Sequence, residues 1–333
     1  MKKFRVGITA DVLKSDGVPI FGAEVLRLLD DPAVEWEYMD QPTVDISQAQ
    51  AARYDAICAL FTRVRSGSLG GADQRLKLIA RLGVGYDSID VPTCTAAGVW
   101  LTIAPDGVRR PVATSALTFV LMLAQKVLIK DRLTREGGWG KKMDHIGTGL
   151  TGRTLGSVGI GNIGAELFRL AKPLDMRGIA HDPAADPTLA RSLGVALVDI
   201  DTLFRESDFL TINCPLNEHT RGLVGARLLG LMKPSAYLIN TARGPIVDER
   251  ALVRALQSGG IAGAGLDVFE EEPTPASNPL LRMDNVVLTP HGICFTDECM
   301  RGLAESAFRA VCDVAAGRTP PYLVNPQALP ART

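Results

Sequence analysis

The sequence predicts an α/β fold built from two doubly wound domains, each with a largely parallel sheet. The 333 residues suffice for two domains of ordinary size, at about 150 residues each. Short apolar runs alternate with helical patterns along the chain, which is typical of a parallel sheet covered by helices on both faces. A glycine-rich strand–turn–helix pattern begins near residue 154, and a second series of strands follows it.

Composition excludes several classes of protein. Charged residues make up 22% and the formal net charge is -1, so neither nucleic acid nor an anionic membrane surface is expected as a partner. The longest apolar run, residues 116–124, is shorter than the ~20 residues of a membrane span, and residues 1–11 hold too few apolar side chains for a secretory signal. Six cysteines without a Cys-x-x-Cys pair predict reduced thiols in a cytoplasmic protein, with no disulfide framework and no metal site.

The first 103 residues contain five apolar runs that we expect to form strands, at residues 4–8, 34–38, 56–61, 76–82 and 99–103, with a helical pattern over 21–29. Ligands of open α/β sheets sit beyond the carboxyl ends of the strands. The third run is followed by Arg63 and Arg65, for which an ordinary solvated loop is an equal alternative. The fourth is followed by Val84 and Gly85, whose backbone amides are suited to a carboxylate.

One long helix is expected over residues 112–133, with Pro111 at its first position. Its apolar face comprises Leu117, Val120, Leu121, Ala124 and Leu128. The polar, glycine-rich segment 136–148, which includes Trp139, cannot build a core. We expect it to form an arm that packs against a second subunit.

The apolar run at 154–160 ends in three glycines with separate physical roles. Gly159 permits a sharp reversal, Gly161 lets a pyrophosphate approach the backbone, and Gly164 lets the next helix lie close to the strand. The amides of Asn162 and Ile163 would point at the anion. A glycine turn in an unrelated α/β domain is the alternative, but the flanking strand and helix favour dinucleotide binding.

Asp182 ends the next apolar run, eighteen residues after Gly164. A carboxylate there can accept both ribose hydroxyls of an adenosine and would repel the extra phosphate of NADP, which favours NAD. Six further strands are expected at 177–182, 195–198, 209–214, 236–240, 264–268 and 286–289, with helices at 189–193, 203–206, 228–232 and 249–257. That count fits a complete dinucleotide-binding domain, and a last helix is expected over 298–315.

Three polar residues, Arg243, Glu272 and His291, stand at or just after strand ends of this second series. An arginine matches a carboxylate with two parallel hydrogen bonds. A histidine gives or takes one proton near neutral pH, and a carboxylate on its other nitrogen fixes the tautomer. A lone histidine is more often structural, and Glu272 ends a charge run typical of a solvated turn. Their shared placement nevertheless predicts hydride transfer on a 2-hydroxy or 2-oxo acid.

These motifs resemble those of the D-isomer-specific 2-hydroxyacid dehydrogenases. The resemblance extends from Gly-Val-Gly-Tyr-Asp at 83–87, through the glycine turn and Cys-Pro-Leu-Asn-Glu-His-Thr at 214–220, to Thr-Pro-His at 289–291. It implies two Rossmann-like or flavodoxin-like domains. The NAD-binding domain, 104–291, would be inserted into a substrate domain made of 1–103 and 292–333. It also implies homodimers formed through the long helix and the arm.

The resemblance also implies residue roles. Arg243 anchors the substrate carboxylate with the amides of Val84 and Gly85, while His291 is the acid/base and Glu272 its partner. The positions similar to cofactor contacts are Cys214, Pro215 and Thr220 beside the adenosine, Thr241 and Ala242 along the nicotinamide, and Asp267 at the carboxamide.

Several positions depart from the family pattern. Asn162 stands where an arginine is common, Thr114 replaces a frequent glutamate, and Gly292, Cys294 and Phe295 replace a run of small residues. Arg63, Arg109 and Arg110 add positive charge. We hypothesise that one of these arginines binds a second anionic or polyhydroxy group of the substrate.

The sequence therefore favours an NAD-dependent oxidoreductase that interconverts a D-2-hydroxy acid and its 2-oxo acid. A phosphite dehydrogenase on the same scaffold is one alternative. A formate enzyme is disfavoured, because such enzymes place a glutamine where this chain has Glu272. The other alternative is a non-enzymatic NAD-sensing scaffold like the C-terminal-binding corepressors, which retain the same three residues.

Overall fold

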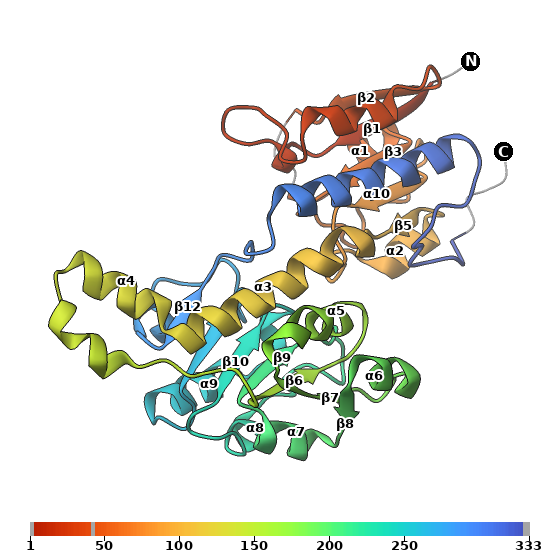
Figure 1. The fold of residues 1–333 in the computed structure, drawn as a ribbon. Helices are drawn as coiled ribbons and strands as arrows, with labels where there is room; N and C mark the ends of the chain where they lie inside the picture. Colours follow the sequence, from red (N-terminus) through yellow and green to blue (C-terminus); the bar gives the residue numbers. More distant parts are fainter. Residues whose placement is uncertain (1–2, 41–43, 329–333) are drawn as a thin grey trace. The chain divides into compact units, whose positions relative to one another are not determined.

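The computed structural model describes residues 3–40 and 44–328 and divides into two compact units (Figure 1). The split unit comprises residues 1–108 and 295–333, and the continuous unit comprises residues 109–294. The sequence placed these crossings at 103/104 and 291/292. The first crossing lies within helix α3 (Pro105–Gln125), whose first turn belongs to the split unit.

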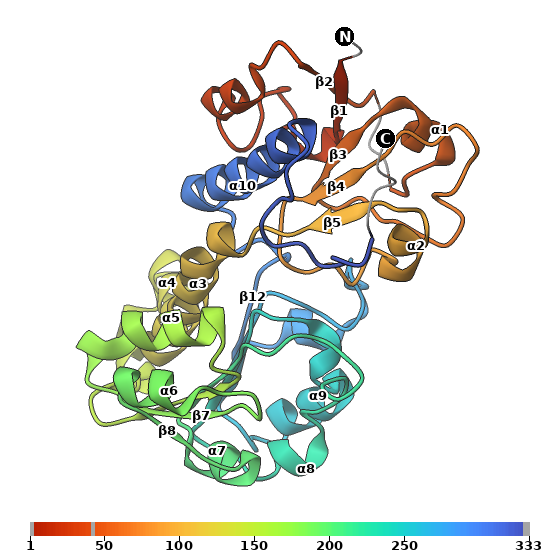
Figure 2. The same cartoon turned by 90° about the vertical axis from the view of Figure 1, so that its right-hand side faces the viewer.

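The split unit holds a five-stranded parallel sheet in the order β2-β1-β3-β4-β5. Its strands are β1 (Phe4–Ile8), β2 (Val34–Tyr38), β3 (Ala56–Ala59), β4 (Leu78–Arg81) and β5 (Trp100–Thr102). Helices α1 (Gln48–Arg53) and α2 (Val91–Ala96) cover one face, while α10 (Asp297–Ala315) packs against the other (Figure 2). This flavodoxin-like order reverses between β1 and β3, and the five predicted strands are confirmed.

The continuous unit holds a seven-stranded parallel sheet in the order β12-β11-β10-β9-β6-β7-β8. Its strands are β6 (Thr154–Val158), β7 (Arg177–His181), β8 (Val195–Leu197), β9 (Phe209–Ile212), β10 (Tyr237–Asn240), β11 (Gly263–Leu266) and β12 (Val286–Leu288). The order reverses between β6 and β9, which is where a doubly wound sheet opens a ligand crevice at its carboxyl edge.

Two apolar layers hold helices against this sheet (Figure 2). One layer includes Phe119 and Leu167 and joins α3, α5 (Asn162–Ala171) and α6 (Pro187–Leu193) to one face. The other includes Phe204 and Leu252 and joins α7 (Ile200–Glu206), α8 (Ala226–Leu229) and α9 (Glu249–Gln257) to the opposite face. With both faces covered, the central strands are buried throughout, which explains why their sequences read as continuous apolar runs.

Three expectations about helices are wrong. Residues 112–133 do not form one helix: α3 ends at Gln125, Lys126 adopts a left-handed conformation (φ 52), and α4 (Val127–Arg135) follows at a bend of 57°. Pro111 lies inside α3, where the buried packing of neighbours such as Ala113 and Ala116 offsets one missing helical hydrogen bond. The pattern over 21–29 forms a 3₁₀ helix, η2 (Ala23–Leu29), beginning after Gly22.

The segment predicted to form an arm contains a 3₁₀ helix, η3 (Trp139–His145), with no buried residue. Trp139, Met143 and Ile146 are each about two-thirds exposed. Within the described residues, no single helix has the length and apolar character needed to cross a membrane; α3 and α4 meet that test only together and are bent.

Candidate active site

The glycine turn lies where the strand order of the continuous unit reverses. Gly159 adopts a left-handed conformation (φ +94), and a Cβ there would stand 2.9 Å from the carbonyl oxygen of Asn213. A Cβ on Gly164 would stand 2.5 Å from the Gly159 carbonyl oxygen, so α5 packs as closely on β6 as the sequence predicted. A Cβ on Gly161 would meet no atom of the described residues within 4 Å. The turn is therefore closely packed against the protein at Gly159 and Gly164 and has open space at Gly161.

Helix α5 begins at Asn162, and its first intrahelical bond runs from the Ala165 amide to the Gly161 carbonyl (2.9 Å). The preceding amides, including that of Ile163, form the positive end of the helix dipole. An anion is stabilised at such a terminus. The geometry of the turn thus fits a pyrophosphate.

A buried polar network that the sequence patterns do not predict supports the turn. Ser157 donates from Oγ to the Gly159 carbonyl (2.6 Å) and accepts from Asn213 Nδ2 (2.8 Å), which also donates to Thr211 Oγ1 (2.9 Å). Ser157 and Thr211 are fully buried in central strands. The feature of the sequence that could have indicated this network is the presence of two hydroxyl residues, Ser157 and Thr211, within otherwise apolar strands.

Asp182 borders the turn from the end of β7. Its Oδ2 accepts from the Ile160 amide (3.0 Å), and its Oδ1 accepts from the Ala184 amide (2.9 Å). Burial and the Asp182 charge raise the pKa of Cys214 to about 11, partly offset by a backbone hydrogen bond. Asp182 and Cys214 thus lie within electrostatic reach of each other, on the side where the resemblance places the adenosine.

Pro215 and Thr220 lie in the turn after Cys214. Thr220 Oγ1 donates to the Pro215 carbonyl (2.6 Å) and accepts from the Asn217 amide (2.8 Å), so the hydroxyl holds the turn together. Both bonds fix the backbone beside the predicted adenosine position.

His291 and Glu272 form a hydrogen-bonded pair. His291 Nδ1 and Glu272 Oε2 are 2.7 Å apart, and the Phe269 amide donates to Glu272 Oε1 (2.9 Å). The His291 side chain is 40% exposed, so the imidazole is not sealed in the core. Burial raises the pKa of Glu272, but hydrogen bonds from His291 and Phe269 and the charges of His291 and Arg243 outweigh it, so this pKa lies below its ordinary value. Glu272 therefore stays ionised near neutral pH.

Arg243 follows β10 by three residues, and its charge acts on Glu272. Arg243 Nη1 donates to the Ala242 carbonyl (2.7 Å). A Cβ on Gly244 would overlap the Phe269 carbonyl, so the loop that carries Arg243 lies directly against the loop that carries Glu272. The structure thus brings together Arg243, Glu272 and His291, which are far apart in the sequence.

Two buried polar atoms near these loops have no hydrogen-bond partner among the described residues: Thr241 Oγ1 and Asn213 Oδ1. Thr241 and Asn213 each follow one of two paired strands, in which Asn240 lies opposite Ile212. Buried polar atoms normally have partners. Orphaned atoms at this edge fit a polar ligand such as the nicotinamide end of the dinucleotide.

Asp267 holds the loop of His291. Its Oδ1 accepts from Thr289 Oγ1 (2.6 Å) and from the amides of Gly292 (2.9 Å) and Ile293 (3.1 Å), while its carbonyl accepts from the His291 amide (2.8 Å). His291 itself has a left-handed backbone (φ 51), which is unfavourable for a non-glycine residue and needs such support. The resemblance assigns Asp267 a cofactor role, whereas its support of the His291 loop is visible only in the structure.

The arginines predicted to bind substrate are engaged in ion pairs. Arg110 Nη1 lies 2.9 Å from Glu166 Oε1, which joins α3 to α5. Arg63 Nε lies 2.9 Å and Arg65 Nε 3.0 Å from the same Asp45 oxygen. Their roles in substrate binding stay predictions.

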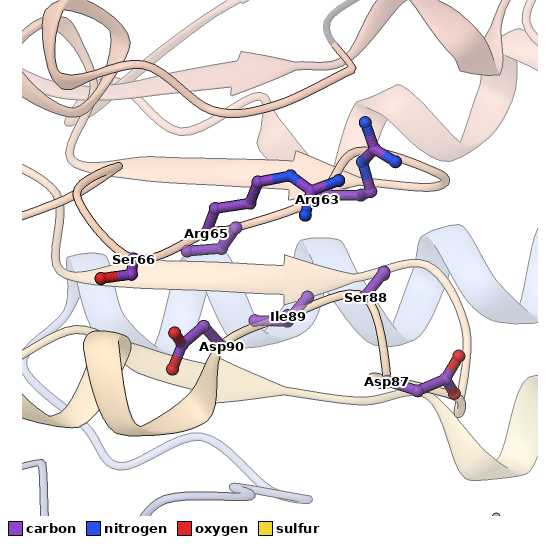
Figure 3. Close-up of a pocket in the computed structure, with 8 residues that line it drawn as sticks. Arg63, Arg65, Ser66, Asp87, Ser88, Ile89 and Asp90 are labelled. Atoms are coloured by element: carbon purple, nitrogen blue, oxygen red, sulfur yellow. The ribbon is translucent and has the colours of Figure 1, made fainter.

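Arg63 and Arg65 line an open cleft of about 440 Å³ in the split unit. Figure 3 shows them on one segment, with Asp87, Ser88 and Asp90 on the neighbouring segment. The lining thus holds two acidic residues, Asp87 and Asp90, as well as two arginines, and Asp45 pairs with both arginines. The cleft therefore carries no excess positive charge for a second anion.

The loop of Val84 and Gly85 follows β4 in the split unit. Arg81 supports it, because its Nε donates to the Gly85 carbonyl (3.1 Å) and its Nη1 donates to the Ala59 carbonyl (3.2 Å). The sequence does not indicate this role of Arg81, because the residue lies within an apolar run.

Comparisons with known proteins identify the family. The family model described as "D-isomer specific 2-hydroxyacid dehydrogenase, NAD binding domain" matches residues 117–292. A glyoxylate reductase of Korarchaeum cryptofilum is 37% identical over 300 residues, covering 89% of this chain and 90% of the relative.

Solved structures agree. The TT0316 protein of Thermus thermophilus aligns with a TM-score of 0.83 at 29% identity, covering 96% of this chain and 99% of that one. A glyoxylate reductase of Paecilomyes thermophila aligns with a TM-score of 0.79 at 28% identity, covering 98% and 100%. The chain therefore belongs to the D-isomer specific 2-hydroxyacid dehydrogenase family and is an NAD-dependent oxidoreductase that acts on the CH–OH group of a hydroxy acid.

Proposed function

We propose that this enzyme interconverts a D-2-hydroxy acid and its 2-oxo acid, with Arg243 as carboxylate anchor and His291 as acid/base. The observation that carries this proposal is the His291–Glu272 pair at 2.7 Å, with the charge of Arg243 acting on the same carboxylate. A cation for the substrate carboxylate and a supported imidazole are the two groups that a 2-oxo acid requires.

The residues at the carboxyl edge of the continuous unit would hold NAD. Gly159, Gly161, Gly164 and the first amides of α5 fit the pyrophosphate, and Asp182 fits the adenosine ribose. Cys214, Pro215 and Thr220 would line the adenosine side. Thr241, Ala242 and Asp267 would lie at the nicotinamide end, where orphaned polar atoms lie. When bound, NADH supplies the hydride that reduces C2 of the 2-oxo acid.

The protein side chains bind and orient the substrate and deliver the proton. Arg243 binds the carboxylate and orients C2, while the amides of Val84 and Gly85 offer further donors. His291, protonated and donating from Nδ1 to Glu272, gives the proton on Nε2 to the C2 oxygen as negative charge develops there. Ionised Glu272 stabilises the imidazolium before transfer and holds its orientation afterwards.

We propose a small 2-oxo acid such as glyoxylate or hydroxypyruvate as substrate. The support is similarity: the relatives named glyoxylate reductase match at 36–38% identity over most of this chain.

We also propose a cytoplasmic homodimer. All six cysteines are free thiols, which suits a reducing compartment. Trp139, Met143 and Ile146 expose apolar surface that a second copy of the arm would cover.

The test is a screen of NADH oxidation with glyoxylate, hydroxypyruvate, pyruvate and larger 2-oxo acids, with NADPH in parallel. We expect NADH-dependent reduction of at least one acid, and a product of D configuration when it is chiral. Formate and phosphite, assayed with NAD in the reverse direction, should give no turnover. Turnover with phosphite alone, or preference for NADPH, would contradict the proposal.

A further inference from the structure

The Asn240 side chain contacts the backbone of the loop that carries Arg243 and has no role in the proposed reaction itself. Asn240 ends β10 and is 1% exposed. Its Oδ1 accepts from the Ala242 amide (3.0 Å), and its Nδ2 donates to the Arg243 carbonyl (2.9 Å). The two bonds tie the strand end to the backbone on both sides of the Ala242–Arg243 peptide.

The loop that carries Arg243 also contacts the segment that holds Glu272, so its position affects both residues. Gly244 lies against the Phe269 carbonyl, and the Phe269 amide donates to Glu272. A shift of the Arg243 backbone would therefore press on the segment that holds Glu272. Asn240 is buried and both polar atoms of its amide bond to the loop, so it has no direct access to a substrate.

We propose that Asn240 is a positioning residue that aims Arg243 at the substrate carboxylate. The inference rests on the proposed function of Arg243. A side chain that both accepts and donates is required. An aspartate at this position still accepts from Ala242 but sets a carboxylate oxygen against the Arg243 carbonyl, which pushes the arginine backbone away. Small displacements of an orienting group are costly in catalysis.

The experiment compares Asn240→Asp with a matched control, Asn325→Asp. Asn325 is equally buried in the split unit, accepts from the Leu101 amide (2.8 Å) and donates to the Val99 carbonyl (2.9 Å). We expect Asn240→Asp to raise KM for the 2-oxo acid by about ten- to hundredfold, with Kd for NADH unchanged. Asn325→Asp should lower Tm but leave KM and Kd unchanged. Equal kinetic effects of the two variants would overturn the proposal.

A double mutant separates positioning from a general structural role. If Asn240 acts through Arg243, adding Asn240→Asp to Arg243→Ala should raise KM no further. An additive increase would overturn the proposal. Should Asn240→Asp fail to fold, Asn240→Ser, whose single shorter hydroxyl cannot replace the two separate bonds of the amide, is expected to give the same rise in KM at unchanged Kd for NADH.

The outcomes also separate this inference from the proposed function. A normal KM in Arg243→Ala would refute the anchor role of Arg243, and the role of Asn240 with it. A raised KM in Arg243→Ala, combined with a normal KM in Asn240→Asp and Asn240→Ser, would refute only the positioning role.

Discussion

The contact between His291 and Glu272 places a carboxylate directly against the imidazole. Because the pKa of Glu272 is lowered, the carboxylate keeps its charge through the neutral range and supports a protonated imidazole. The bond from Phe269 holds the other carboxylate oxygen, so the pair has a fixed orientation.

Glu272→Gln tests this support. The amide still accepts from Nδ1 but carries no charge, so kcat/KM for reduction should fall by about 10- to 100-fold near neutral pH. Steady-state kinetics of reduction at neutral pH check this, with Glu271→Gln as the neighbouring control. An unchanged kcat/KM in Glu272→Gln would contradict the assigned role.

Sequence reasoning identified the residues that follow strands, because parallel strands bring their carboxyl ends to one edge. It did not identify Asn240, Arg81 or the second role of Asp267. Their bonds join backbone groups of loops whose proximity exists only in the folded chain. Arg63 and Arg110 were singled out for their charge, and their acidic partners, far away in the sequence, could not be seen from it.

At the scale of elements, the glycine turn offers two substitutions with different expected outcomes, and a third glycine outside the turn serves as a control. Gly164→Ala should lower stability by about 1–3 kcal/mol, because its Cβ would meet the Gly159 carbonyl. Gly161→Ala should leave Tm unchanged, since its Cβ faces open space, but should weaken NADH binding where the pyrophosphate is expected. Gly149→Ala, also in open space but away from the turn, is the control.

Thermal denaturation and NADH titration by fluorescence distinguish these variants. If Gly161→Ala bound NADH as tightly as Gly149→Ala, the pyrophosphate would not lie over this turn.

Asp208 fastens the amino ends of β6 and β9. It accepts from the Thr154 amide (2.8 Å) and pairs with Lys233 (2.9 Å). Burial raises the pKa of Asp208. The bonds from Thr154 and Lys233 and the charges of Lys233 and Arg153 together outweigh burial, so this pKa lies below its ordinary value. Its contribution to stability is therefore present above the pKa of the unfolded state, about 4, and is lost as pH falls through the folded value.

Asp208→Asn should lower the free energy of unfolding by about 2–3 kcal/mol at neutral pH. The difference from the native protein should shrink as the pH is lowered below about 4. Denaturant unfolding across this range measures it, and a difference independent of pH would show that the charge is unimportant.

Most strands could be predicted because buried parallel strands are short, continuous apolar runs. Their predicted ends were too long where apolar residues continue into loops, as Leu60 and Phe61 do after β3. The boundary between α3 and α4 at Lys126 could not be predicted from the sequence, because the apolar residues on either side of it, Ala124 and Leu128, keep helical spacing.

For the whole molecule, the alternation of strands and helices predicted two parallel-sheet units but did not determine their strand orders. Those orders depend on crossovers that the pattern alone does not encode. The proposed homodimer rests on the apolar side chains that the arm exposes.

The double variant Trp139→Glu, Met143→Glu tests the homodimer. Charges on two side chains that are each about two-thirds exposed should not disturb the fold of the chain, but they would be buried at an interface. We expect a dimer for the native protein and a monomer for the variant by light scattering coupled to size exclusion. A native monomer would contradict the proposal.

The central claim is that His291 delivers the proton during reduction of a 2-oxo acid. The most direct measurement is the single-turnover rate of NADH oxidation, at saturating 2-oxo acid, in native enzyme and His291→Ala. The rate should fall by about 10²- to 10⁴-fold, while Kd for NADH stays unchanged. A variant rate close to the native one would contradict the claim.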